Sequence, residues 1–153
     1  MQTMRQMAGL LLLTAAAAAA SAQETCDRAC LTSFVDSWFE GLAAGNTRGI
    51  ALARDAKITL NNRETSLADT FWDGAGTAVY RWDIVNERLG DTGTEAVVAN
   101  ADGSNTMVAL RLKLASGQIT EVELIRANRG DADGLWGDDL TEVSPELTLS
   151  IRE

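Results

Sequence analysis

The side chains that could transfer protons in this chain are few, because its 153 residues include no histidine. Serine–histidine and cysteine–histidine nucleophiles are therefore excluded, and so are zinc or iron sites built on imidazole ligands. The remaining acids and bases are carboxylates, lysines and one tyrosine, Tyr80. Because we also find no cofactor motif, any reaction of this protein would be a cofactor-free proton transfer.

Tyr80 lies in Thr77–Asn86, a segment whose alternation of apolar and polar residues is typical of a β-strand. Tyr80 and Trp82 share its apolar face, which we expect to point towards the protein interior. Two such aromatic side chains can simply be core, but a buried phenol needs a hydrogen-bond partner and suits an aromatic ligand. Arg81 and Asp83 alternate with them and are expected to form a weak ion pair on the outer face.

Arg126 is a second polar candidate, because it shares one face of a predicted strand with Val122 and Leu124. A position at the exposed end of the strand is the simpler explanation. If the guanidinium faces inward, it could hold an anionic or phenolate group of a substrate.

The only two cysteines, Cys26 and Cys30, stand at the start of a predicted helix. Residues four apart in a helix have Cα atoms about 6 Å apart, which is within disulfide range. A redox-active pair would more often have C-x-x-C spacing on a thioredoxin-like pattern. We therefore favour a structural disulfide that fixes the N-terminus over redox chemistry.

Ion-binding motifs are weak in this sequence, although Asp131, Asp133, Asp138 and Asp139 could in principle bind Ca²⁺ or Mg²⁺. No EF-hand spacing is present, so an acidic surface loop is favoured and no metal site is predicted. The glycine-rich stretch 73–76 lacks the lysine and the strand-to-helix context of a phosphate loop. The net charge of −9 makes nucleic acid and anionic lipid poor partners.

The elements that position these residues form an α+β pattern. An antiparallel meander is predicted from four alternating segments separated by short breaks rich in glycine, aspartate, asparagine and serine. The expected elements are a helix over Asp27–Ala44, a short helix from Thr47 to Arg54, a strand over Asp55–Leu60, a helical turn within Ser66–Trp72, and strands over Thr77–Asn86, Thr94–Asn100, Thr106–Leu114 and Ile119–Arg126. The apolar stripe of the first helix would cover one face of the sheet, so a ligand would bind between them.

The first segment, Met1–Ala22, has the features of a secretory signal peptide. Arg5 precedes an alanine-rich apolar run, and Ala20–Ala22 is an A-x-A cleavage site. The run is too short for a membrane span, and no later segment approaches that length. We therefore expect residues 23–153 to form a single periplasmic or secreted domain without stable membrane insertion.

Parts of this sequence resemble the NTF2-like superfamily, which includes SnoaL-like proteins and ketosteroid isomerases. The resemblance rests on Val35–Ile50 and on short motifs typical of a secreted, poorly characterised branch. These motifs are Cys26–Leu31, Ile58–Asn62, Gly74–Arg81 and Ala109–Glu123, with Thr59, Asn61, Trp72, Tyr80 and Arg81 in the matching positions. Leu60 stands where the branch has an acidic residue.

The resemblance implies a cone in which a curved antiparallel sheet wraps around the N-terminal amphipathic helix. The apolar pocket of such a cone lies between the sheet and the helix, and many members dimerise through the outer sheet face. Trp38 stands where the isomerases carry an oxyanion-holding tyrosine, and Glu64 lies close to the position of their general base. An exposed loop is the alternative location for Glu64.

Two functions follow as hypotheses. The first is an exported, cofactor-independent lyase, dehydratase or isomerase acting on an apolar, aromatic small molecule. Tyr80, Glu64 and Arg126 would be its catalytic residues, and Trp38, Asn61, Trp72 and Trp82 would bind the substrate. The alternative is a non-catalytic periplasmic module that binds a hydrophobic small ligand in the same pocket. A structural role through the outer face is disfavoured, because charged residues such as Arg111 and Glu123 interrupt it.

Overall fold

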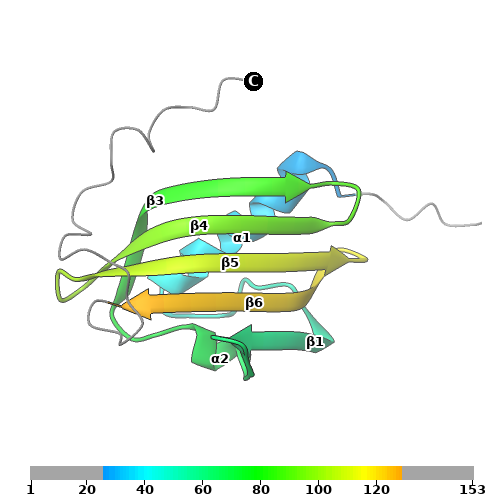
Figure 1. Cartoon of the computed structure of the whole chain (residues 1–153). Coiled ribbons are helices and arrows are strands. Elements are labelled where there is room, and N and C mark those ends of the chain that lie inside the picture. The colour runs from blue at the N-terminus through cyan, green and yellow to red at the C-terminus, as the bar shows by residue number, and fades with distance from the viewer. Residues whose placement is uncertain (1–25, 129–153) are drawn as a thin grey trace, which may run out of the picture.

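The computed structural model describes residues 26–128 (Figure 1). The expected signal peptide, the acidic residues 131–139 and the final apolar run at 146–151 lie outside this range. None of the helices within it is long and apolar enough to cross a membrane.

Helix α1 (Arg28–Ala43) confirms the predicted amphipathic helix. It begins at Asp27, whose carboxylate accepts a hydrogen bond from the Cys30 backbone N–H at 2.9 Å and so caps the first turn. It ends before Gly45, which has a left-handed φ of 61° that favours glycine. Its buried stripe consists of Leu31, Val35, Trp38, Phe39 and Leu42.

The expected disulfide between Cys26 and Cys30 is present, with Cα atoms 5.2 Å apart. It links the residue before the N-cap Asp27 to the first turn of α1. The bond therefore fixes the start of the helix that covers the sheet.

A six-stranded sheet forms the rest of the domain, in the order β2-β1-β6-β5-β4-β3. Its strands are β1 (Leu52–Leu60), β2 (Arg63–Glu64), β3 (Ala75–Asn86), β4 (Asp91–Asn100), β5 (Asn105–Ala115) and β6 (Gln118–Asn128). Strands β3 to β6 form the predicted antiparallel meander, whereas β1 pairs with β6 in parallel. The sheet is curved and α1 crosses its concave face, so the expected α+β cone is confirmed (Figure 1).

The prediction of a second helix from Thr47 to Arg54 is wrong. Strand β1 already begins at Leu52, whose Cα pairs with that of Ile119 at the start of β6. A hydrogen bond of 2.8 Å from the Ile119 N–H to the Ala51 carbonyl extends this pairing. Long-range strand pairing therefore overrides the local helical pattern. The predicted turn at Asn61 and Asn62 and the helical turn α2 (Leu67–Thr70) are both present.

A β-bulge in β3 reverses the faces that alternation predicted for this strand. Ala78 pairs with Val98, but Tyr80 pairs with the very next residue, Val97, so two residues of β3 oppose one of β4. From this point on, Tyr80 and Trp82 lie on the outer face of the sheet. The expectation that they point at the helix is wrong, because a single extra residue exchanges the two faces of a strand.

The concave face and the buried stripe of α1 form one hydrophobic core. The sheet contributes mainly leucine and valine from β4, β5 and β6, and the Trp38 ring packs 5.0 Å from that of Phe71. Trp38 is only 1% exposed. The space between helix and sheet is therefore filled with side chains along most of its length, and towards the edge strand β3 it opens into a cleft.

Candidate functional site

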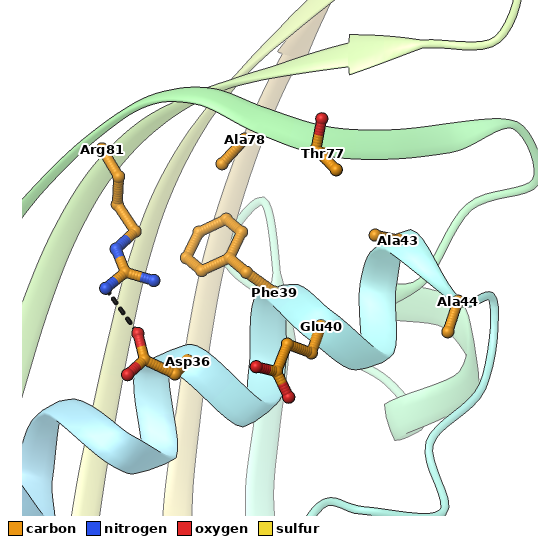
Figure 2. Close-up of a pocket in the computed structure, with 8 residues that line it drawn as sticks. All are labelled: Asp36, Phe39, Glu40, Ala43, Ala44, Thr77, Ala78 and Arg81. Atoms are coloured by element: carbon orange, nitrogen blue, oxygen red, sulfur yellow. Dashed lines mark hydrogen bonds and ion pairs between the residues drawn. The ribbon is translucent and has the colours of Figure 1, made fainter.

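A cleft of about 510 Å³ lies between α1 and the edge strand β3 (Figure 2). Its volume falls within the range of small-molecule sites, roughly 300–1,000 Å³. Its lining residues are Asp36, Phe39, Glu40, Ala43 and Ala44 from α1, with Thr77, Ala78 and Arg81 from β3. The small residues leave room for a ligand, and the three charged residues give the cleft its polarity.

Arg81 crosses the cleft because the bulge turns it to the concave side. Its Cα pairs with that of Ala96, a residue that is 2% exposed on that face. The guanidinium Nη2 donates to Asp36 Oδ1 at 2.6 Å, and Nε donates to Asp83 Oδ2 at 2.9 Å. The expected outward pairing of Arg81 and Asp83 is therefore wrong in its location, because the pair lies on the concave face. Figure 2 shows the contact of Arg81 with Asp36 across the cleft.

The guanidinium is further fixed by contacts on either side of these ion pairs. Arg81 lies over the Phe39 ring, with its Cζ atom 5.7 Å from the ring centroid, within cation–π range. The hydroxyl of buried Thr94 donates to Asp83 Oδ1 at 2.8 Å and holds that carboxylate in place. Arg81 is thus positioned by two carboxylates and one ring, and its charge is compensated within the protein.

Glu40 follows Asp36 by one helical turn on the same side of α1. Its side chain is exposed, and no ion pair of Glu40 occurs within residues 26–128. Carboxylates at positions i and i+4 repel one another, and only Asp36 is neutralised by a guanidinium. The cleft therefore retains one uncompensated negative charge beside an alanine-rich wall.

A second cluster of polar residues lies at the end of β6, on the other side of the concave face. Asn61 braces this end, since its Nδ2 donates to the Arg126 carbonyl at 3.1 Å and its Oδ1 accepts from the Arg126 N–H at 2.8 Å. The Arg126 guanidinium lies over the Trp72 ring, 5.2 Å from its centroid. Arg126 pairs with buried Val108, so it faces inward at the open end of the strand.

The Trp72 indole anchors a chain of hydrogen bonds beside this group. Its Nε1–H donates to Asn100 Oδ1 at 3.0 Å, and Asn100 Nδ2 donates to Thr106 Oγ1 at 2.9 Å. The Thr106 hydroxyl in turn donates to Asn128 Oδ1 at 3.0 Å. These amide and hydroxyl groups are hydrogen-bonded to one another, and the hydrogen bonds link β4, β5 and β6.

The other residues singled out from the sequence do not converge on one site. Tyr80 and Trp82 lie on the outer face, and Trp38 is a core side chain that does not line the cleft. Glu64 is exposed on β2, at the opposite edge of the sheet from β3. Asn61, Trp72 and Arg126 are brought together, but away from the cleft. Catalytic roles for Tyr80, Glu64 and Arg126 on one substrate atom do not fit this arrangement.

The cleft residues that the sequence did not single out are Asp36, Phe39, Glu40 and the alanines that end α1. Asp36 borders the apolar stripe of the helix and Arg81 is the only cation of β3, so a pairing across the interface was a possible signal. That signal could be read only with the bulge known, because unbroken alternation puts Arg81 on the other face. Between residues 26 and 128 there is also no cluster of three or more acidic or cysteine side chains suited to a metal ion.

A smaller groove of about 270 Å³ lies on the outer face of β3 to β6. Its apolar wall includes Trp82, Ile84 and Ile125, which are 38%, 55% and 51% exposed. Arg111 borders it and donates to Glu121 at 3.0 Å and to Glu123 at 3.2 Å. The outer face is therefore less interrupted by free charge than the sequence suggested.

No protein-family model and no curated protein matches this sequence. A de novo designed protein with a curved β-sheet superposes with a TM-score of 0.56 at 14% identity, covering 66% of this chain and 88% of its own. A protein with a cystatin-like fold from Methylobium petroleophilum PM1 gives 0.55 at 12% identity, covering 75% and 89%. A candidate polyketide cyclase from Xanthomonas campestris pv. campestris gives 0.50 at 18% identity, covering 62% and 88%.

Identities this low show the fold alone. The chain has the cystatin-like α+β fold that its resemblance to NTF2-like domains led us to expect. Because this fold hosts unrelated functions, the function has to be argued from the cleft itself.

Proposed function

We propose that this protein is a non-catalytic module that binds a small molecule with an apolar body in the cleft between α1 and β3. The observation that carries the proposal is the cleft of about 510 Å³, whose alanine-rich wall is joined to a few fixed polar groups. Ligand sites commonly combine a mostly apolar lining with a small number of positioned polar groups.

Binding is favoured over proton-transfer catalysis because the cleft contains no arranged pair of acid and base. Its guanidinium is occupied by Asp36 and Asp83, at 2.6 and 2.9 Å. Lyase, dehydratase or isomerase activity by Tyr80, Glu64 and Arg126 would require them to act together, and they lie on three separate parts of the sheet.

We also propose a cellular location and an oligomeric state for this protein. The N-terminal sequence Met1–Ala22 supports export to the periplasm or beyond the cell. The outer groove with exposed Ile84 and Ile125 supports a homodimer through the outer sheet face, because burial of apolar side chains stabilises association. Sedimentation equilibrium of the exported protein tests the dimer.

Filling the cleft tests the proposed site. Ala43 is an exposed residue of α1 that lines the cleft, and Ala29 is an exposed residue of the same helix that does not. We expect Ala43→Trp to weaken binding of the neutral fluorescent probe N-phenyl-1-naphthylamine by at least about tenfold, equivalent to about 1.4 kcal/mol. Ala29→Trp, the matched control, should bind the probe like the unmodified protein.

Both variants should keep the melting temperature of the parent within a few degrees, since exposed positions tolerate substitution. Equal binding by the parent and both variants would show that the cleft is not the ligand site. Binding of the probe to none of the three proteins would likewise contradict the proposal.

A further inference from the structure

The charges around the cleft are unequal. Asp36 and Glu40 of α1 line the cleft, and Asp83 of β3 contacts Arg81. These three carboxylates outnumber the single guanidinium of Arg81. Since Asp36 and Asp83 offset the charge of Arg81, the exposed Glu40 is the charged lining residue that has no ion-pair partner within residues 26–128. A bound cation would also relieve the repulsion between Asp36 and Glu40, which are four residues apart on one helix.

The end of α1 adds to this negative potential. The cleft runs along the C-terminal half of the helix and reaches Ala43 and Ala44. Peptide dipoles give a helix C-terminus the equivalent of about half a negative charge. No basic side chain lies in the last turn of α1 to offset it. Two independent features therefore favour positive charge at the same place: a carboxylate without an ion-pair partner within residues 26–128, and a helix C-terminus.

An anionic ligand would be disfavoured in this cleft for the same reasons. Arg81 offers the only positive charge among the lining residues, and its Nη2 and Nε atoms already donate to Asp36 and Asp83. Its Cζ atom also lies 5.7 Å from the centroid of the Phe39 ring. A carboxylate or phosphate entering the cleft would meet a guanidinium whose charge is already offset by two carboxylates, and it would face Glu40.

We infer that the cleft selects amines, that is, ligands with a protonated nitrogen attached to a compact apolar body. This inference rests on the proposed function and names the class of its ligand. The ammonium group would lie beside Glu40 and the C-terminal end of α1. The apolar body would lie against Ala43, Ala44 and Ala78, with the Arg81 side chain closing one side (Figure 2).

Three probes with the same phenyl group but different charge test this inference: 2-phenylethylamine, 2-phenylethanol and 3-phenylpropanoate. Dissociation constants would be measured at pH 7 and low ionic strength by chemical-shift titration of the labelled protein. We expect the amine to bind about fivefold more tightly than the alcohol, the ratio that about 1 kcal/mol between two charges 4 Å apart in water provides. The carboxylate should bind more weakly than the alcohol, and added salt should reduce the preference for the amine.

The variant Glu40→Gln should reduce the preference for the amine over the alcohol while leaving the affinity for the alcohol unchanged. Asp55→Asn is the matched control, because it removes one exposed carboxylate of β1 outside the cleft. In this control the preference should persist. Loss of the preference in both variants would assign it to net charge instead of the cleft, and would overturn the inference.

The remaining outcomes separate the inference from the proposed function. If amine and alcohol bind equally and Ala43→Trp blocks both, the cleft is a binding site and the amine preference is wrong. If the amine binds equally well to the parent and to Ala43→Trp, it binds elsewhere and the inference fails even where the neutral probe occupies the cleft. If no probe binds, both proposals are wrong for ligands of this size.

Discussion

Replacing Thr92 by valine should stabilise this protein, even though the change removes a polar group from a β-strand. Thr92 is 2% exposed on the concave face of β4, where its Cα pairs with that of Leu112. Its hydroxyl has no hydrogen-bond partner within residues 26–128. Threonine and valine have nearly the same shape, so the substitution exchanges an unsatisfied hydroxyl for a methyl group without opening a cavity.

The magnitude follows from the cost of burying a polar group without a partner, which is about 1–3 kcal/mol. Because the strand can adjust slightly in either variant, we expect Thr92→Val to raise the free energy of unfolding by about 1 kcal/mol, near the lower limit of that range. In a domain of about 100 residues this corresponds to a rise in melting temperature of roughly 4–8 °C.

Thr106 provides the matched control, because it is fully buried on the same face and its hydroxyl makes two hydrogen bonds. Thr106→Val removes an acceptor from Asn100 and a donor from Asn128, so it should lower stability by about 1–3 kcal/mol. Urea unfolding followed by tryptophan fluorescence measures both changes. If Thr92→Val destabilises the protein as much as Thr106→Val does, the Thr92 hydroxyl has a partner and the reasoning is wrong.

Two further predictions concern the disulfide at the start of α1 and a glutamate on the outer face of the sheet. The Cys26→Ser/Cys30→Ser variant should fold but lose about 2 kcal/mol, the small value expected for so short a loop. Treating the parent with reductant should shift its urea midpoint to that of the variant, and an unchanged midpoint would contradict the structural role. On the outer face, hydrogen bonds from Arg111 and then Lys113 lower the pKa of Glu121 below its usual 4.5. Its stabilising contribution is therefore present above pH 4.5 and is lost as pH falls through the folded value. Between pH 6 and pH 3, the free energy of unfolding should decline less steeply for Glu121→Gln than for the parent. Parallel curves for the two proteins would contradict a stabilising role of the hydrogen bonds from Arg111 and Lys113 to Glu121.

The sequence by itself determined the covering helix and the meander. Apolar residues at helical spacing on α1, an aspartate N-cap and a glycine after the last turn are local signals, and each acts within a few residues of the chain. The turn glycines and asparagines likewise fixed where β4, β5 and β6 begin and end to within a few residues. The disulfide also followed from the sequence, because Cys26 and Cys30 are only four residues apart at the start of α1.

Strand faces were determined by the sequence only where pairing is regular. Along β5, the buried positions at Val108, Leu110, Leu112 and Leu114 are those that alternation predicted. In β6, a register shift opposite Lys113 and Leu114 buries Ile119, although unbroken alternation with Val122 and Leu124 would place it on the other face. A bulge depends on how two distant strands align, so it leaves no dependable mark in either strand alone.

The candidate site was decided by the tertiary structure. The bulge between Ala78 and Tyr80 moved the tyrosine to the outer face and brought Arg81 to Asp36, a residue 45 positions earlier in the chain. The sequence indicated that Arg81 would pair with Asp83, but not that the pair would lie on the concave face or that Asp36 would join it. Long-range packing selects that pairing, because one extra residue in a strand reverses every side chain that follows it.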